Sequence, residues 1–394
     1  MKILVATFTY YPNVDGVAEA ARSMVDTLLT EGHEVSVATG KIASIIREVT
    51  PNAAAIHRFS INGSPAIGNG FRGEVAEYQA FLAKHCADVI IFHGWDTWPV
   101  EIALPILPKL RGKSVLLSHG YAGHQVLDLS KFPRGLRSWF KWLPHVLSLP
   151  WDLRAFDQVV FLSNKADFTR FFDVWVAKKT RCKNTRMIPN GIDARNWHLI
   201  PANFREFANL SDGVFFLYVA NYFPGKNQAM ALEAFCNANI QGSVLVFIGS
   251  ELGDYGSSVM ATWNNIRTNY PNLSVHFYEN LERSQVISAF RSCDIAVISS
   301  KSEAQPLTIL ESMASGKPFI STDVGCVTEF EGGLVVKNIE EMARSMRKLA
   351  ENPAERGELG RRGKECFDLN YSAEVTTRAW LDLINQIVGK GNAV

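Results

Sequence analysis

Residues 302–318, SEAQPLTILESMASGKP, set two glutamates on either side of the start of a predicted helix. Glu303 follows the apolar run Asp294–Ser300, DIAVISS, which predicts a buried strand. Pro306 suits the first position of a helix, where its missing N–H costs nothing, and Glu311 would lie inside that helix. One carboxylate is therefore expected at a strand end and the other about one turn or more along the helix.

The start of this helix is also a predicted anion site. The N–H groups of Leu307, Thr308 and Ile309 have no acceptor within a first helical turn, and the helix dipole adds partial positive charge there. A diphosphate with a sugar at each end fits between the two carboxylates.

Length and composition predict a globular enzyme with two domains. The 394 residues exceed what one hydrophobic core usually organises, and no apolar run is long enough to cross a bilayer. A net charge of +1 gives no global attraction for nucleic acid, and six scattered cysteines show no close pair of the zinc or redox type. The first residues, MKILVATFTYYP, predict a buried strand rather than a signal peptide, so we expect a cytoplasmic protein.

Strand and helix patterns alternate along both halves of the chain, which predicts parallel sheets covered by helices on both faces. In the first half the expected strands are Ile3–Phe8, Glu34–Thr39, Ala55–Ser60, Val89–His93, Ser114–Ser118 and Gln158–Leu162. In the second half they are Val214–Asn221, Ser243–Gly249, Val275–Tyr278, Ile295–Ser300 and Phe319–Thr322. The expected helices include Val17–Thr30, Gly73–Cys86, Asn227–Asn239 and Ser284–Arg291. The result is an α/β protein with two doubly wound domains.

The domain boundary is expected near Asp193, because Pro189, Asn190 and Gly191 form a turn and the polar stretch Asn196–Ser211 looks irregular. We predict an N-terminal domain over residues 1–193 and a C-terminal domain over residues 194–371. Apolar residues at helical spacing make residues 372–394 a final amphipathic helix.

The segment 302–318 resembles the Glu, seven residues, Glu motif of retaining glycosyltransferases of family 4. Other similar stretches are the N-terminal strand, turn and helix, ADVIIFHGW at Ala87–Trp95, VLLSHG at Val115–Gly120 and IPNGID at Ile188–Asp193. Their order and spacing cover most of the chain and are far more specific than any single match. The resemblance implies the GT-B fold, two Rossmann-like domains facing across a cleft, with the last helix crossing back to the N-terminal domain. It implies acceptor binding by the N-terminal domain and nucleotide-sugar binding by the C-terminal domain.

The resemblance also assigns roles to residues after predicted strand ends, where ligands of open parallel sheets bind. Glu303 would orient the hydroxyls of the donor sugar, Glu311 would hold the ribose, and Lys226 would neutralise the diphosphate. Asn221 stands where the family usually has an arginine, which removes one fixed charge at the leaving group. The backbone of the stretch with Glu279 and Leu281 would read the base. The other donor-binding candidates of the C-terminal domain are Pro306, Leu307 and Thr308.

Five residues of the N-terminal domain complete the candidate site. Gly16 would let backbone approach the donor closely, although Asp15 replaces a second glycine of the family. His119 would lie near the donor sugar, but a histidine at a strand end is more often structural than catalytic. His93, Trp95 and Asp96 are acceptor candidates: Trp95 can stack on a sugar face or pack in the core.

The reaction that the resemblance implies is transfer of a hexose-type sugar from a nucleoside diphosphate to an acceptor hydroxyl, with retained anomeric configuration, in glycolipid, lipopolysaccharide or polysaccharide assembly. Helix N–H groups and Lys226 would stabilise the charge that grows on the leaving diphosphate. No cofactor is expected, and the lack of an Asp-x-Asp motif implies a metal-independent reaction. A sugar-nucleotide epimerase of the same fold and a catalytically weakened binding subunit are the alternatives, the second suggested by Asn221.

Residues 131–147, KFPRGLRSWFKWLPHVL, form a basic amphipathic pattern. The basic residues are Lys131, Arg134, Arg137 and Lys141, and the predicted apolar stripe is Phe132, Leu136, Trp139, Phe140 and Leu143. Such a helix either lies in a membrane interface or turns its stripe to the core. The first alternative would bring the protein to the inner face of the cytoplasmic membrane.

Overall fold

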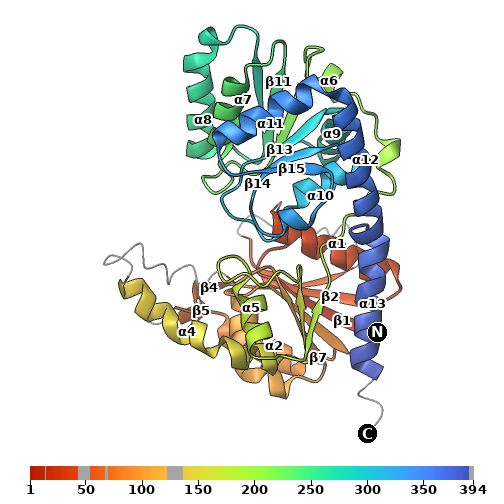
Figure 1. The fold of residues 1–394 in the computed structure, drawn as a ribbon. Coiled ribbons are helices and arrows are strands. Elements are labelled where there is room, and N and C mark those ends of the chain that lie inside the picture. The colour runs from red at the N-terminus through yellow and green to blue at the C-terminus, as the bar shows by residue number, and fades with distance from the viewer. Residues whose placement is uncertain (14, 43–53, 67–69, 122–135, 390–394) are drawn as a thin grey trace. The chain divides into compact units, whose positions relative to one another are not determined.

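The structure is a computed structural model, and it describes residues 1–13, 15–42, 54–66, 70–121 and 136–389. The chain divides into two compact units. Unit 1 comprises Met1–Asn190 and Thr376–Val394, and unit 2 comprises Gly191–Val375. Each unit is built around one parallel sheet (Figure 1).

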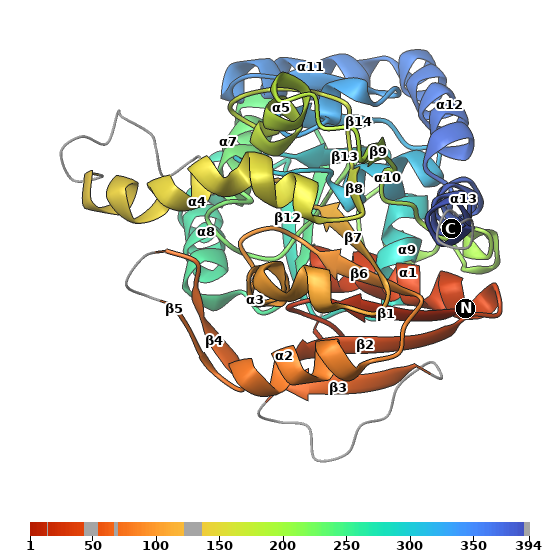
Figure 2. The same cartoon turned by 90° about the horizontal axis from the view of Figure 1, so that it is seen from below.

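The sheet of unit 1 has seven parallel strands in the order β3-β2-β1-β6-β7-β8-β9 (Figure 2). These strands are β1 (Lys2–Ala6), β2 (Glu34–Gly40), β3 (Ala55–Phe59), β6 (Val89–His93), β7 (Lys113–Ser118), β8 (Gln158–Phe161) and β9 (Thr185–Met187). The central strands are nearly continuous apolar runs, since both faces of the sheet are covered. The chain moves outward from β1 to β3 and then returns to pair β6 with the other side of β1.

The helices of unit 1 are α1 (Gly16–Thr30), α2 (Val75–Lys84), α3 (Trp98–Ala103), α4 (Leu136–Ala155), α5 (Phe172–Lys179) and α13 (Ala373–Gly389), whose first three residues belong to unit 2. A 3₁₀ helix, η1, covers Leu104–Lys109. The sequence patterns missed an antiparallel hairpin of β4 (Ile61–Ser64) and β5 (Gly70–Gly73), because its glycines have weak strand propensity.

The sheet of unit 2 has six parallel strands in the order β12-β11-β10-β13-β14-β15. They are β10 (Phe215–Val219), β11 (Val244–Gly249), β12 (Ser274–Glu279), β13 (Ile295–Ile298), β14 (Phe319–Thr322) and β15 (Gly333–Val336). Phe216, Phe235 and Phe247 belong to a core of buried side chains that also includes Trp263 and Met346. This core holds α7, α8 and α11 on the sheet.

The helices of unit 2 are α6 (Phe204–Phe207), α7 (Gln228–Ala238), α8 (Gly253–Ile266), α9 (Arg283–Ser292), α10 (Leu307–Ala314), α11 (Ile339–Glu351) and α12 (Pro353–Asn370). Short 3₁₀ helices are η4 (Trp197–Leu199), η5 (Arg267–Asn269) and η6 (Val327–Glu329). The prediction that Asn196–Ser211 is irregular is wrong in part, since η4 and α6 lie there. Phe204 anchors α6 because its ring is buried against Phe215.

Helix α4 corrects the prediction for residues 131–147. The helix continues to Ala155, and Lys131, Phe132 and Arg134 lie outside the described residues. The face that packs in the core consists of Val146, Leu149 and Leu153. Phe140, which was expected on the apolar stripe, is exposed and so does not turn to the core.

None of the helices in the described part of the chain combines the length and the apolar character that crossing a bilayer requires.

Candidate functional site

Lys226 and Glu303 lie together in unit 2 because of the strand order. Strand β10 pairs with β11 on one side and with β13 on the other, so the chain reverses its direction of winding between β10 and β13. Ligands of open α/β sheets bind at such a point, beyond the carboxyl ends of the strands. The loop after β10 carries Lys226, and the loop after β13 carries Glu303. The Lys226 Nζ atom lies 2.5 Å from Glu303 Oε1, with both side chains largely buried.

Hydrogen bonds hold these two loops in one arrangement. The Tyr218 hydroxyl donates to the Lys226 carbonyl, and the Ser299 hydroxyl donates to the Asn227 carbonyl at 2.7 Å. The Lys301 N–H donates to the Gly225 carbonyl at 2.8 Å. The ammonium group is thus positioned before any ligand arrives, which is the condition for strong electrostatic stabilisation of a developing anion.

The predicted anion site lies at the start of α10, one residue later than expected. Pro306 is the N-cap, in an extended conformation, and the helix begins at Leu307. The Ile309 N–H donates to the Pro306 carbonyl at 3.1 Å, so Ile309 is not available as expected. Leu307 and Thr308 stay as candidate N–H donors, because their positions in the first turn have no intrahelical acceptor.

Glu311 lies in α10 as predicted and is 6% exposed. Its Oε1 atom lies 2.5 Å from Nη1 of Arg283, the first residue of α9. The guanidinium of Arg283 also lies over the ring of Trp197, 5.5 Å from its centroid. Arg283 was not predicted from the sequence, although its place directly after the predicted base-reading stretch was a usable signal.

The other predicted donor contacts of unit 2 lie after β10 and β12. Glu279 ends β12 and accepts a hydrogen bond from the Leu252 N–H at 2.6 Å. Leu281 follows in the half-buried turn before α9. The Asn221 carbonyl accepts a hydrogen bond from the amide of the fully buried Gln228 at 3.0 Å, which fixes the backbone of Asn221.

Gly325 packs closely against the backbone of the Glu303 loop. This role of Gly325 was not predicted from the sequence. A Cβ atom at Gly325 would lie 2.1 Å from the Ala304 carbonyl oxygen and 2.6 Å from that of Glu303. The φ angle of Gly325 is +49°, in the left-handed region. The Cys326 N–H donates to the Ala304 carbonyl at 3.0 Å. Only glycine allows this approach.

Gly325→Ala is therefore expected to lower the free energy of unfolding by about 1–3 kcal/mol and turnover by at least about tenfold, because the Glu303 loop must move. Denaturant unfolding and initial rates measure the two effects. Gly357→Ala in α12 is the matched control, since a Cβ at Gly357 meets nothing within 4 Å. Turnover in Gly325→Ala equal to that of the control would contradict this role of Gly325.

In unit 1, Gly16 begins α1 and Asp15 caps the helix. The Asp15 Oδ1 atom accepts hydrogen bonds from the N–H groups of Val17 and Ala18, both at 3.0 Å. Thr9 donates its hydroxyl to Asp15 Oδ2 at 2.7 Å. The cap explains why aspartate stands here. A phosphate approaching Gly16 would meet this carboxylate, whereas a sugar hydroxyl could donate to it.

His93, at the end of β6, is fully buried, and it pairs with the half-buried His119, which directly follows β7. The Nε2 atom of His119 lies 3.3 Å from Nδ1 of His93. Burial, and then the charge of His119, hold the pKa of His93 well below 6.5. Burial lowers the pKa of His119 to about 4. Both rings are neutral at pH 7, so one of the two facing nitrogens carries the proton that it donates to the other.

The low pKa of His119 predicts a pH dependence of stability. In the unfolded chain His119 binds a proton below about pH 6.5, whereas the folded protein binds it only near pH 4. The contribution of His119 to stability is therefore complete above pH 6.5 and is lost as the pH falls to about 4. Compared with His119→Gln, the wild-type free energy of unfolding should fall by roughly 3 kcal/mol over this range.

Denaturant titrations of both proteins at several pH values measure this difference. The comparison with the variant is needed because burial raises the pKa of Glu101 to about 7. The contribution of Glu101 to the free energy of unfolding therefore decreases as the pH rises. This opposes the contribution of His119 when the wild-type free energy of unfolding is plotted against pH. A difference between the two proteins that does not change with pH would rule out a buried neutral His119.

Trp95 follows the packing alternative, and Asp96 is paired with a histidine. The Trp95 ring is 4% exposed and lies edge-on to Tyr121 and Phe156, so it packs in the core. The Asp96 Oδ1 atom lies 2.8 Å from Nε2 of His145 in α4. Sequence alone could not separate stacking from packing for Trp95, because both need an aromatic ring.

Among the residues of unit 1 that the structure describes, Asp96, Glu101 and His145 could offer ligand atoms to a metal ion, since one atom of each lies within 4.8 Å of the others. The single imidazole of His145 already contacts the Asp96 carboxylate at 2.8 Å. His145 also lies 3.6 Å from Glu101. Burial acts to lower the pKa of His145, but the hydrogen bond that His145 donates to Asp96 and the charges of both acids raise the pKa above its usual value.

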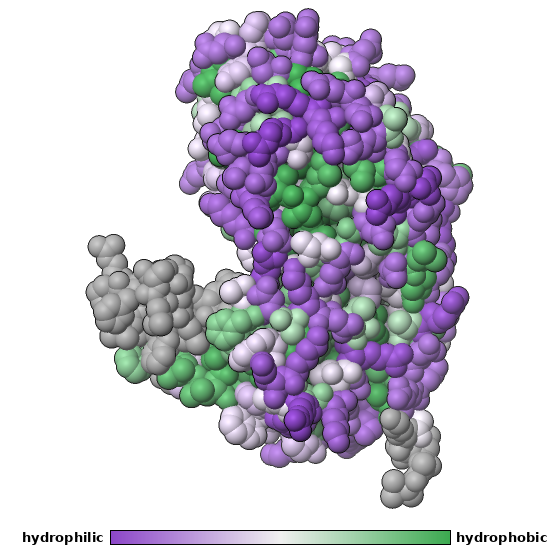
Figure 3. Space-filling view, viewed as in Figure 1, coloured by the Kyte–Doolittle hydropathy of each residue, from purple (hydrophilic) through white to green (hydrophobic). Residues whose placement is uncertain are grey.

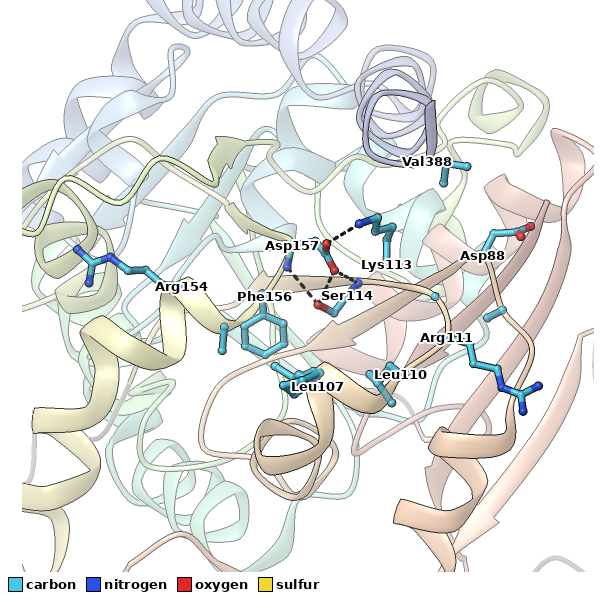
Figure 4. Close-up of a pocket in the computed structure, with 14 residues that line it drawn as sticks. Asp88, Leu107, Leu110, Arg111, Lys113, Ser114, Arg154, Phe156, Asp157 and Val388 are labelled. Atoms are coloured by element: carbon cyan, nitrogen blue, oxygen red, sulfur yellow. Dashed lines mark hydrogen bonds and ion pairs between the residues drawn. The ribbon is translucent and has the colours of Figure 1, made fainter. Parts of the chain in front are cut away.

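A hollow of about 720 Å³ in unit 1 lies at the opposite edge of the sheet. Lys113 and Ser114 begin β7 there, and Asp157 directly precedes β8 (Figure 4). Asp157 accepts hydrogen bonds from the Ser114 N–H at 2.9 Å and the Lys113 ammonium at 3.0 Å. These contacts join two strand starts, away from the predicted site residues.

Both halves of the chain match known families. Residues 14–196 match the sequence model described as Glycosyltransferase Family 4, and residues 200–366 match the one described as Glycosyl transferases group 1. No curated protein sequence matches this chain.

Solved glycosyltransferase structures share the fold. Sucrose-phosphate synthase from Thermosynechococcus elongatus has a TM-score of 0.77 at 18% identity, with 99% of each chain covered. Anabaena HepE in complex with UDP has a TM-score of 0.73 at 15% identity, covering 98% of this chain and all of that one. WaaG, which acts in lipopolysaccharide biosynthesis, has a TM-score of 0.69 at 18% identity, with the same coverage.

The two parallel-sheet units thus define an α/β protein of the GT-B class, as predicted. The chain belongs to the group 1 glycosyltransferases related to family 4, which confirms the resemblance.

Proposed function

We propose that the protein transfers a hexose-type sugar from a nucleoside-diphosphate sugar to an acceptor hydroxyl, with retention and without a metal. The observation that carries this proposal is the Lys226–Glu303 pair, 2.5 Å apart at the point where the sheet of unit 2 reverses its winding. Unit 2 would hold the donor and unit 1 the acceptor. HepE of Anabaena, which has the same fold, has been solved in complex with UDP and with UDP-glucose.

The charges of unit 2 support a diphosphate ligand. An ammonium group donates three hydrogen bonds, so Lys226 can keep Glu303 as a partner and still donate to a phosphate oxygen. The N–H groups of Leu307 and Thr308 add donors at the positive end of α10.

In the proposed reaction the bond between the anomeric carbon and the diphosphate oxygen breaks. The acceptor oxygen forms its bond to the same face of that carbon, and the acceptor proton passes to the departing diphosphate. Lys226 and the helix N–H groups stabilise the negative charge on the leaving group, and Glu303 holds the sugar hydroxyls. His119, being neutral, would orient the sugar as a hydrogen-bonding partner.

A two-stage assay tests the proposal. A thermal-shift screen of nucleoside diphosphates identifies the base, and incubation with the matching nucleotide sugars then measures released diphosphate and, by NMR, the product anomer. Release of nucleoside diphosphate with a retained anomer is expected. Conversion of the nucleotide sugar without release would identify an epimerase, and binding without either reaction would identify a binding subunit.

Chelation tests the proposal that sugar transfer does not require a metal ion. We expect EDTA to leave turnover within about twofold, because Lys226 and the start of α10 neutralise the leaving group. Initial rates with EDTA, and after adding back Mg²⁺ or Mn²⁺, provide the measurement. Complete loss that either ion restores would contradict this mechanism.

We further propose that the acceptor is lipid-linked, in glycolipid, lipopolysaccharide or polysaccharide assembly at the cytoplasmic membrane. WaaG, with the same fold, is involved in lipopolysaccharide biosynthesis. The basic segment 131–147 supports membrane attachment by its charge.

A further inference from the structure

Helix α4 carries apolar side chains on two opposite faces. Val146, Leu149 and Leu153 are at most 7% exposed and join the core of unit 1. On the other side, Phe140, Leu147 and Trp151 are 60%, 59% and 71% exposed. We call these three residues the outer stripe. The first face accounts for the packing of the helix, so the outer stripe needs a separate explanation.

The spacing of the outer stripe makes it a straight ridge. At about 100° per residue, Phe140, Leu147 and Trp151 fall within an arc of roughly 40°. With a rise of 1.5 Å per residue, the ridge is about 16 Å long. Pro144, also exposed, lies on the same side of the helix.

The ridge stands out from the rest of unit 1. Two views of the chain show the amino-terminal half of α4 extending beyond the sheet (Figures 1 and 2). In the space-filling view the surface over α4 is apolar (Figure 3). Lining up exposed aromatic side chains in this way costs free energy in water, and such patches mark interaction sites.

The charge of the sequence that leads into and includes the ridge favours a lipid surface over a protein partner. Between residues 129 and 151 the sequence has Lys131, Arg134, Arg137 and Lys141 and no acidic residue. Each basic residue close to an anionic membrane adds about 1 kcal/mol of attraction. A stable protein interface needs about 800 Å² from each partner, which a ridge one helix wide does not offer, whereas fluid headgroups close around it.

We propose that the outer stripe of α4 inserts into the interface of an anionic membrane, with Trp151 and Phe140 as the inserted aromatic side chains. This inference rests on the proposed lipid-linked acceptor and names the surface that brings unit 1 to it. It moves the contact from the predicted segment 131–147 to a face that ends at Trp151.

Cosedimentation with vesicles of phosphatidylglycerol and phosphatidylcholine tests the proposal. The wild-type protein should bind the anionic vesicles and bind pure phosphatidylcholine more weakly. The triple variant F140S/L147S/W151S should lose at least about tenfold in partition coefficient, or ~1.4 kcal/mol. These side chains are exposed, so the variant should keep its fold. Leu369→Ser in α12, at a residue 73% exposed, is the matched control and should bind as the wild type does.

Three results would overturn the proposal. The first is that the wild-type protein fails to bind anionic vesicles at low salt. The second is that the triple variant binds as well as Leu369→Ser. The third is that the wild-type protein is a dimer and the triple variant is a monomer. The last would show that a second copy covers the ridge. Thermal shifts with the set of nucleoside diphosphates on the same samples separate the two proposals. Wild-type protein that none of them stabilises would count against the donor site and leave the vesicle result standing.

Discussion

Lys226→Met should lower the turnover number by roughly 100- to 1,000-fold, the usual cost of removing one preorganised donor that stabilises a developing anion. Lys226 carries the positive charge of the loop after β10, and Asn221 in the same loop adds none. Methionine keeps most of the side-chain volume, so the loss would report charge rather than packing. The Michaelis constant for the donor should change less than turnover, since leaving-group charge grows after binding.

The neighbouring lysine supplies the control. Lys301 is exposed, and its backbone, not its ammonium, joins the Lys226 loop. Lys301→Met should therefore turn over at close to the wild-type rate. Thermal unfolding of both variants checks that the partly buried Glu303, left without its partner, does not unfold the loop. Equal rates for the two variants would remove Lys226 from the mechanism.

The strands were the part of the fold that the sequence predicted well. Val89–His93 and Phe319–Thr322 match β6 and β14 residue by residue, because buried parallel strands are short apolar runs bounded by polar turns. The misses were β9 and β15, and the β4–β5 hairpin. These three- and four-residue strands depend on pairing with distant neighbours, so local composition carries little signal for them.

The candidate site was predictable in its positions but not in its partners. Parallel topology places every strand's carboxyl end at one edge, which is why Lys226 and Glu303 meet although 77 residues separate them. That Glu311 pairs with Arg283 depends on the relative placement of α9 and α10, which no local pattern encodes. The role of Gly325 was not predictable for the same reason, because its neighbour is the carbonyl of Ala304, twenty-one residues earlier in the sequence.

Replacing Glu303 and replacing Glu311 should have different effects on the steady-state kinetics. Glu303→Ala should lower turnover by about 100-fold or more, because in the proposed mechanism Glu303 would hold the reacting sugar, and its carboxylate contacts Lys226. Glu311→Ala should instead raise the donor Michaelis constant by roughly tenfold to 100-fold, the value of one charged hydrogen bond to a ribose hydroxyl. Steady-state kinetics over a range of donor concentrations distinguishes the two effects.

A third variant and a double variant sharpen this separation. Glu340 is an exposed glutamate at the start of α11, so Glu340→Ala should leave both constants unchanged. In the double variant Glu303→Ala/Lys226→Met the two losses should add only in part, because one role of Glu303 is to position Lys226 through their 2.5 Å contact. Fully additive losses would mean that the ion pair is not the functional unit. Small and equal effects of Glu303→Ala and Glu311→Ala would contradict the assignment of sugar and ribose to these carboxylates.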